Sequence, residues 1–241
     1  MNLKNILDIH RDSLISSVQK LIQFKSVEGD PVDNLPFGKD VDDALRYVLD
    51  LGNEMGFHTV YKDGYYGYIE MGSGEELIGI LAHLDVVPAE EPDKWIFPPF
   101  EGKIYDNKIY GRGAMDDKGP LMATLYAMKV VKDANLPLNK RIRLILGTNE
   151  ETNWKGINKY IENEEIPDYG FAPDSDFPLI NAEKGLLQIK LSSNKNTDFT
   201  LSGGGALNSV PNECVYSGEN SHLLAPIADE LNYDFNQKNY D

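Results

Sequence analysis

The chain has 241 residues, a length that fits one large domain or one domain with part of another. Hydrophobic residues make up 41% of it, enough to bury a core, and acidic residues outnumber basic ones by 39 to 23, for a formal net charge of −16. This charge repels nucleic acid and anionic membranes, so we exclude both as partners. Cys214 is the only cysteine, which excludes an intrachain disulfide and a cysteine-based zinc site. The first 25 residues resemble neither a signal peptide nor a membrane span, so we predict a cytoplasmic protein.

The first three quarters of the chain predict an α/β fold. Apolar residues at helical spacing indicate helices, and short apolar or alternating runs bounded by Gly and Pro indicate strands. Strands that alternate with helices favour a largely parallel sheet covered on both faces. The predicted helices are 3–25, 41–55, 120–134 and 155–162, and the predicted strands are 58–61, 65–71, 77–84, 141–146 and 169–172.

The pattern changes after about residue 185. Residues 186–191 and 199–202 alternate like antiparallel strands, and a run of three glycines follows at 203–205. We therefore predict a domain over 1–185 and the beginning of a second α+β domain over 186–241. The latter has few residues for an independent core.

Charged residues follow several of the predicted strands. His83 and Asp85 end one strand, Glu150-Glu151 follows another, and Asp174 follows a third. Asp116-Asp117 forms a further acidic pair between a Gly-rich turn and a predicted helix. In open α/β sheets, ligands bind at the carboxyl ends of the strands, so these residues are candidates for one site.

Each of these residues also has a simpler interpretation when it is taken alone. His83 could be hydrogen-bonded in a core with Asp85 capping its strand, and Asp116 could cap a helix. Glu150-Glu151 could lie in a solvated loop, although adjacent carboxylates repel unless a cation or a proton neutralises them. Asp174 could cap a turn.

Together, one histidine and several carboxylates favour a divalent metal site. Zn²⁺ accepts both imidazole nitrogen and carboxylate oxygen, and Mn²⁺ or Co²⁺ are alternatives. The chemistry expected of such a site is water activation, in which the metal lowers the pKa of bound water and a nearby Glu takes its proton.

Several longer motifs resemble the M20 metallopeptidases, and within them the dipeptidase V-like branch. They occur in the family's order over about residues 20–210: PFGKDV (36–41), ILAHLDVVPA (80–89), IYGRGAMDDKGP (109–120), LGTNEETNWKG (146–156), FAPDSDFPLINAEKG (171–185) and NSVPN (208–212). The resemblance implies a zinc-exopeptidase-like catalytic domain with an inserted lid domain.

The resemblance also implies a role for each matched residue. His83 and Asp174 would bind one zinc ion, Glu151 a second, and Asp116 would bridge the two, with a cis peptide between Asp116 and Asp117. Asp85 would be the catalytic aspartate that orients His83, and Glu150 the general base. Asn208 would contact substrate from the lid. The implied reaction is hydrolysis of a dipeptide that has a free N-terminus.

The pattern lacks one expected ligand. The family has a further metal-binding His near the end of the catalytic domain, and complete members are roughly twice this length. His10, His58 and His222 do not match that His in context. We therefore expect a truncated chain with a weak second zinc site and little or no activity alone. The alternatives are an N-acyl amino acid deacylase of the same fold, and a non-catalytic remnant or a subunit that pairs with a separately encoded C-terminal half.

Overall fold

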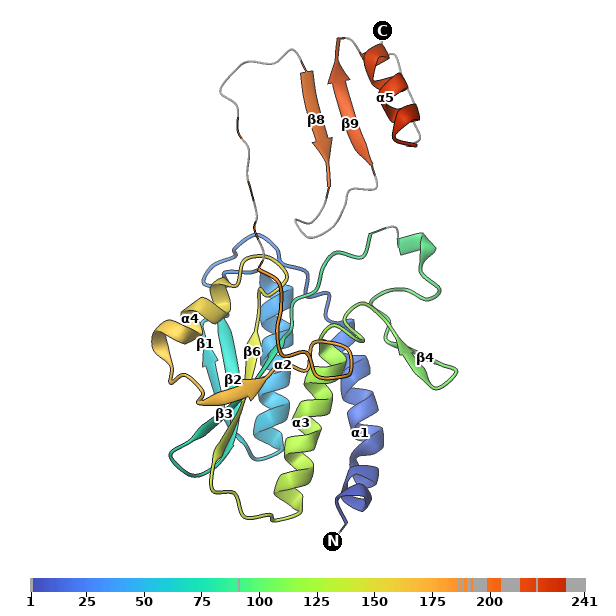
Figure 1. Ribbon diagram of the computed structural model, residues 1–241. Coiled ribbons are helices and arrows are strands. Elements are labelled where there is room, and N and C mark those ends of the chain that lie inside the picture. Colours follow the sequence, from blue (N-terminus) through green and yellow to red (C-terminus); the bar gives the residue numbers. More distant parts are fainter. Residues whose placement is uncertain are drawn as a thin grey trace. The chain divides into compact units, whose positions relative to one another are not determined.

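The computed structural model describes residues 2–90, 92–185, 187, 189, 192, 199–204, 213–219 and 221–232. The chain falls into two compact units, Met1–Asn181 and Ala182–Asp241, a division close to the predicted boundary at residue 185. In the first unit, helices pack on a five-stranded sheet (Figure 1). Its elements are α1 (Leu3–Gln23), α2 (Lys39–Glu54), β1 (His58–Lys62), β2 (Tyr66–Gly72), β3 (Leu77–His83), the 3-10 turn η1 (Pro92–Lys94), β4 (Lys103–Tyr105), β5 (Lys108–Tyr110), α3 (Lys118–Asp133), β6 (Arg141–Gly147), α4 (Lys155–Asn163) and β7 (Tyr169–Phe171).

The sheet has the order β1-β2-β6-β3-β7, and the predicted α/β fold class is confirmed. β6, β3 and β7 run parallel, while β1 and β2 form an antiparallel hairpin whose second strand pairs antiparallel with β6. The parallel part places the carboxyl ends of β3, β6 and β7 at one edge. This is the edge where the sequence has its charged residues.

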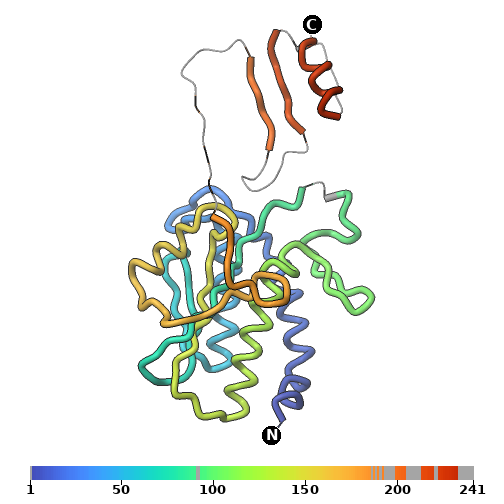
Figure 2. Tube along the Cα trace, viewed as in Figure 1, coloured from blue at the N-terminus to red at the C-terminus, as the bar shows by residue number. Residues whose placement is uncertain are grey.

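The two faces of the sheet are covered by different helices. Along β6, Leu144 and Leu146 join the core that α1, α2 and α3 form, whereas Ile145 between them packs with Ile157 and Tyr160 of α4. This alternation is the two-residue period of a strand with apolar neighbours on both sides. Figures 1 and 2 show α1 beside α3, in agreement with their packing contacts.

Two hairpins of the first unit have tight turns. The Asp63-Gly64 turn joins β1 to β2 as predicted, and both residues have positive φ angles of 47° and 72°. The β4–β5 hairpin was not predicted, although its turn residues Asp106 and Asn107 also have positive φ angles of 48° and 57°. Asp and Asn tolerate this conformation, so the Asp-Asn pair between two KIY segments was the available signal.

The second unit contains an antiparallel hairpin of β8 (Phe199–Gly203) and β9 (Cys214–Gly218). The 3-10 turn η2 (Ser221–Leu223) and the short helix α5 (Leu224–Glu230) follow it. β8 confirms the strand predicted over 199–202, and the sequence did not predict α5. The strand predicted over 186–191 falls mostly outside the described residues, and Leu187 and Ile189, which are described, do not lie in a strand.

The packing of α3 on the sheet gives a stability prediction. Leu121 of α3 is fully buried in the core between the helices and the sheet. We expect Leu121→Ala to lower the free energy of unfolding by about 2–5 kcal/mol, because it removes buried methyl groups and leaves a cavity. Leu136→Ala is the matched control, since Leu136 is 47% exposed. Chemical denaturation checks both, and equal losses in the two variants would contradict this description of the core.

Candidate metal centre

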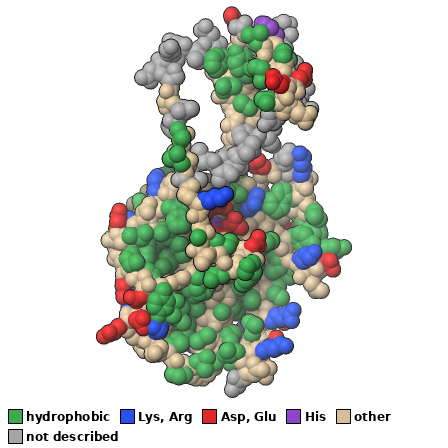
Figure 3. Space-filling model, viewed as in Figure 1, with side chains coloured by type: hydrophobic (Ala, Val, Ile, Leu, Met, Phe, Trp, Pro, Cys, Tyr) green, Lys and Arg blue, Asp and Glu red, His purple; other side chains and the backbone are tan. Residues whose placement is uncertain are grey.

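The charged residues predicted from the sequence meet at the carboxyl edge of the parallel strands. His83 is the last residue of β3, Glu150 and Glu151 follow β6, and Asp174 follows β7. Asp116 comes from the turn before α3, so its carboxylate lies near the positive end of the helix dipole. Acidic side chains gather beside basic ones on the visible face of the first unit (Figure 3).

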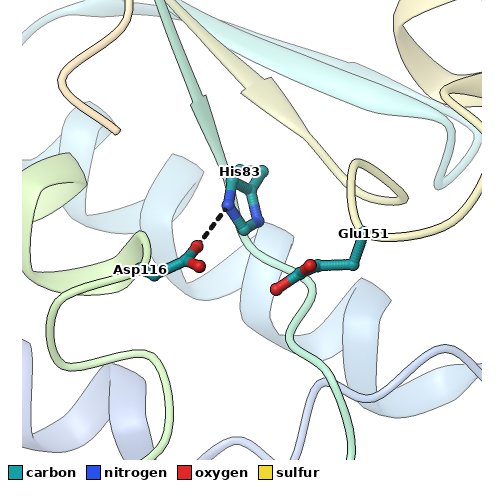
Figure 4. A group of neighbouring side chains, drawn as sticks. All are labelled: His83, Asp116 and Glu151. Carbon is teal, nitrogen blue, oxygen red and sulfur yellow. Dashed lines mark hydrogen bonds and ion pairs between the residues drawn. The ribbon is translucent and has the colours of Figure 1, made fainter. Parts of the chain in front are cut away.

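His83 is the buried centre of this group, with its side chain 3% exposed. Its Nδ1 donates to the backbone carbonyl of Asp85 at 2.9 Å, so Nδ1 carries a hydrogen and Nε2 is the nitrogen that faces the carboxylates. Nε2 lies 2.9 Å from Asp116 Oδ1 and 3.4 Å from Asp174 Oδ2. Figure 4 shows the contact with Asp116 and the nearby side chain of Glu151. Such an orientation is the usual one for a histidine that binds metal through Nε2.

The carboxylate of Asp85 lies beneath the turn that follows β6. Its Oδ1 lies 3.6 Å from His83 Nδ1, and its two oxygens accept hydrogen bonds from the backbone N–H groups of Glu150 and Glu151, each at 3.0 Å. The hydrogen bond of His83 Nδ1 is thus made with the backbone carbonyl of Asp85. The carboxylate itself, 1% exposed, holds the turn that carries both glutamates.

Asp116 and Asp117 have opposite environments on either side of a cis peptide, which the resemblance predicted. Asp116 is 63% exposed, and its hydrogen bond with His83 lowers its pKa. Asp117 is fully buried, and its Oδ2 accepts a hydrogen bond from the His83 backbone N–H at 3.1 Å. Burial raises the pKa of Asp117 to about 7. Asp117 thus fixes the end of β3, while Asp116 faces the site.

The protonation of the site reflects its crowded carboxylates. Burial raises the pKa of Glu150 to about 7, and burial together with the charge of Asp116 also raises the pKa of Glu151. Burial opposes the charged form of His83, but hydrogen bonds with Asp116 and Asp174 outweigh it and raise the pKa of the imidazole. These shifts show that the carboxylates need positive charge near them, which either protons or a cation can supply.

The donor set fits a divalent cation. Among the described residues, two groups have ligand atoms within 4.8 Å of one another: His83 with Asp116 and Glu151, and His83 with Glu150 and Asp174. One imidazole nitrogen with several carboxylate oxygens suits Zn²⁺, Mn²⁺ or Co²⁺. The structure thus brings together His83, Asp116, Glu150, Glu151 and Asp174, with Asp85 beneath the turn. Asn208 lies outside the described residues.

The sequence did not point to Asn149, which organises the loop next to the glutamates. It is 1% exposed; its Nδ2 donates to Thr152 Oγ1 at 2.7 Å, and its Oδ1 accepts from the Gly156 N–H at 3.1 Å. The Glu28 carboxylate also accepts a hydrogen bond from Thr152, which ties the loop after α1 to this loop. In the sequence, the only indication of this role of Asn149 was its position between a buried strand and two acidic residues.

The fold is α/β, and side chains that could hold a divalent cation gather at the carboxyl edge of its parallel strands. The sequence pattern of Peptidase family M20/M25/M40 matches residues 79–237. This chain belongs to that family. Among its described residues, no helix has the length and the apolar character needed to cross a membrane.

Curated relatives of the chain agree with this family assignment. A Bacillus subtilis protein named "Putative dipeptidase YtjP" is 42% identical over 92% of this chain and 50% of its own length. A Staphylococcus epidermidis protein named "Putative dipeptidase" is 40% identical over 79% of this chain and 41% of its own length. The chain therefore spans about half the length of the curated relatives it matches.

The solved structures that resemble the chain show the same fold. Human carnosine dipeptidase 1 has a TM-score of 0.63 at 22% identity, over 73% of this chain and 42% of that one. The metallo-carboxypeptidase Sso-CP2 of the M20 family from Sulfolobus solfataricus has a TM-score of 0.55 at 25% identity, over 66% of this chain and 37% of that one. At 22% identity, the likeness to human carnosine dipeptidase 1 supports the fold alone.

The raised pKa values predict how the stability of the metal-free protein depends on pH. A group whose pKa is higher in the folded state stabilises the fold below its unfolded pKa, and this contribution is lost as the pH rises through the folded pKa. Glu150 and Asp117 both have folded pKa values of about 7, so metal-free protein should lose stability between about pH 5 and about pH 8. Thermal unfolding in the presence of a chelator measures this.

Substitution and metal addition separate the causes of that pH dependence. Glu150→Gln should reduce it to the part that Asp117 contributes, because the amide does not titrate, whereas Glu162→Gln on the exposed side of α4 should leave it unchanged. A divalent cation at about a hundredfold above its Kd should stabilise by about 2.7 kcal/mol, or roughly 5–10 °C in Tm. A metal-free protein that is more stable at high pH would contradict the electrostatic description.

The two hydrogen bonds of Asp85 give a further prediction. In Asp85→Asn the side chain keeps one acceptor oxygen and presents an NH₂ group to a backbone N–H, so one hydrogen bond to a charged acceptor is lost. We expect a stability loss of about 1.5–3 kcal/mol, and faster hydrogen exchange at the amides of Glu150 and Glu151. Unchanged exchange at both amides would show that Asp85 does not hold this turn.

Proposed function

We propose that this chain carries the metal-binding and proton-transferring residues of a zinc-dependent dipeptidase, which hydrolyses the amide bond of dipeptides with a free N-terminus. The observation that carries the proposal is the buried His83, with Nδ1 held by a carbonyl and Nε2 surrounded by the carboxylates of Asp116, Glu151 and Asp174. The names of the relatives support the choice of dipeptides as substrates.

In this proposal the ligands are divided between two zinc ions. His83, Asp116 and Asp174 would hold the first ion, and Asp116 and Glu151 the second. The contacts of His83 Nε2 with Asp116 at 2.9 Å and Asp174 at 3.4 Å support the first set, and the closeness of Glu151 to Asp116 supports the second. The imidazole and carboxylate donors would also accept Mn²⁺ or Co²⁺.

Bound divalent cations supply Lewis acidity, which polarises the scissile carbonyl and makes a water molecule more acidic. Glu150 accepts the proton of the attacking water and can return it to the leaving amine. Burial raises the pKa of Glu150 to about 7 in the metal-free protein, and a carboxylate beside the attacking water can serve as a general base. Asp85 positions Glu150 through the backbone N–H that it binds. Asp117 positions His83 in the same way.

The role of Glu150 is tested by comparing metal content with turnover. We expect Glu150→Ala to retain its zinc and to hydrolyse dipeptides about 10²- to 10⁴-fold more slowly, because it lacks the proton acceptor. Zinc content by elemental analysis and hydrolysis of a dipeptide panel check this. Glu162→Gln serves as the surface control and should match the wild type.

Three results would change the proposal. Equal rates for the wild type and Glu150→Ala would remove Glu150 from the role of base. Hydrolysis of N-acyl amino acids in preference to dipeptides would favour a deacylase. A zinc-loaded wild-type chain that hydrolyses neither would agree with the expected low activity of the chain alone and would favour a non-catalytic remnant or a subunit, whereas full turnover would contradict that expectation. The separately encoded C-terminal half and the cytoplasmic location stay predictions.

A further inference from the structure

Lys118, the first residue of α3, is a lysine that the proposed metal chemistry does not use. It is fully buried, although an amino group in the interior is unfavourable unless it forms hydrogen bonds. Among the described residues, its Nζ has one hydrogen-bond partner, the backbone carbonyl of Phe24, at 2.7 Å. Phe24 caps the C-terminal end of α1, where helix carbonyls have no partner within the helix. Lys118 thus joins the start of α3 to the end of α1.

The side chain of Lys118 packs against the turn that leads to Asp116. A Cβ atom on Gly113 of this turn would lie 2.9 Å from Cδ of Lys118 and 3.0 Å from Cγ1 of Val86, so these groups pack without spare room. Gly113 also has a φ angle of 81°, a left-handed conformation that favours glycine. The position of the turn therefore depends on the path of the Lys118 side chain.

Ser26, in the segment that follows α1, binds the extension of β3. It is fully buried; its Oγ donates to the Leu84 carbonyl at 2.6 Å, and its own carbonyl accepts from the Val86 N–H at 3.0 Å. Leu84 and Val86 flank the buried Asp85. The segment after α1 is therefore bound both by Lys118 and by the residues around Asp85.

We propose that Lys118 and Ser26 form a buried clamp that sets the distance between His83 and Asp116, and that Lys118 is a positioning residue for metal binding. This inference rests on the ligand roles given to His83 and Asp116 in the proposed function. The two side chains approach each other from different segments, with Nε2 and Oδ1 2.9 Å apart (Figure 4). The clamp binds both segments, and residues that hold metal ligands in place raise the affinity for the metal.

The clamp does not depend on the charge of Lys118. Burial lowers the pKa of its amino group to about 7, and the charge of Asp85 opposes that shift. Both the amine and the ammonium form can donate a hydrogen bond to the Phe24 carbonyl.

The test measures the zinc affinity of Lys118→Met, which keeps an unbranched side chain and removes the hydrogen-bond donors. We expect Lys118→Met to bind zinc about 10- to 100-fold more weakly than the wild type, the usual effect of losing a residue that holds a metal ligand. Ser26→Ala, a smaller change, should weaken zinc binding in the same direction. Competition with a chromophoric chelator gives the Kd of each folded protein.

Leu125→Ala is the matched control for a general loss of stability, because Leu125 is fully buried about two turns further along the same helix. It should bind zinc as tightly as the wild type at a temperature where every variant is folded. The visible spectrum of the Co²⁺-loaded protein adds a readout of ligand geometry. This spectrum should change in Lys118→Met and stay unchanged in Leu125→Ala.

Equal zinc affinities and equal Co²⁺ spectra in the wild type, Lys118→Met and Ser26→Ala would overturn the clamp. An equal loss of affinity in Leu125→Ala would also overturn it, because zinc binding would then follow stability alone. If Lys118→Met does not fold, Ser26→Ala decides: weaker zinc binding supports the clamp, and unchanged binding overturns it. None of these measurements requires hydrolysis of a dipeptide, so the clamp and the proposed activity fail by separate results.

Discussion

The structure depends on placing many carboxylates around one buried imidazole. Asp116, Glu150, Glu151 and Asp174 converge on His83 Nε2 at the carboxyl edge of the parallel strands, where burial raises the pKa of both glutamates. Such a concentration of negative charge is unfavourable unless protons or cations offset it. A divalent cation does this best, since it can contact several of these oxygens at once. Without a cation the clustered carboxylates repel one another, and a bound divalent cation would offset that repulsion.

Hydrogen bonds beneath the site keep the ligands in place. Asp85 binds the backbone of Glu150 and Glu151, Asp117 binds the backbone of His83, and Asn149 closes the loop that follows the glutamates. All three residues are buried, and each accepts hydrogen bonds from backbone N–H groups. They fix the ends of β3 and β6 before any cation binds, which reduces the conformational cost of assembling the site.

The sequence predicted those features that follow from chain topology. A parallel arrangement of strands 77–83, 141–147 and 169–171 necessarily brings His83, Glu150 and Asp174 to one edge, so the cluster could be anticipated from strand ends alone. The hydrogen-bond partners of Asp85 could not be anticipated in this way. A residue two positions after His83 can approach its ring with either the side-chain carboxylate or the backbone carbonyl.

The most direct test of the central claim is whether zinc binding depends on the one nitrogen shared by both ligand groups. Purified wild type, His83→Ala and His10→Ala should be dialysed against Zn²⁺ and their bound zinc measured by elemental analysis; His10 lies on α1 and pairs with Asp133. We predict that wild type and His10→Ala retain zinc while His83→Ala loses most of it. Equal retention by all three proteins, or no retention by wild type, would contradict a metal centre built on His83.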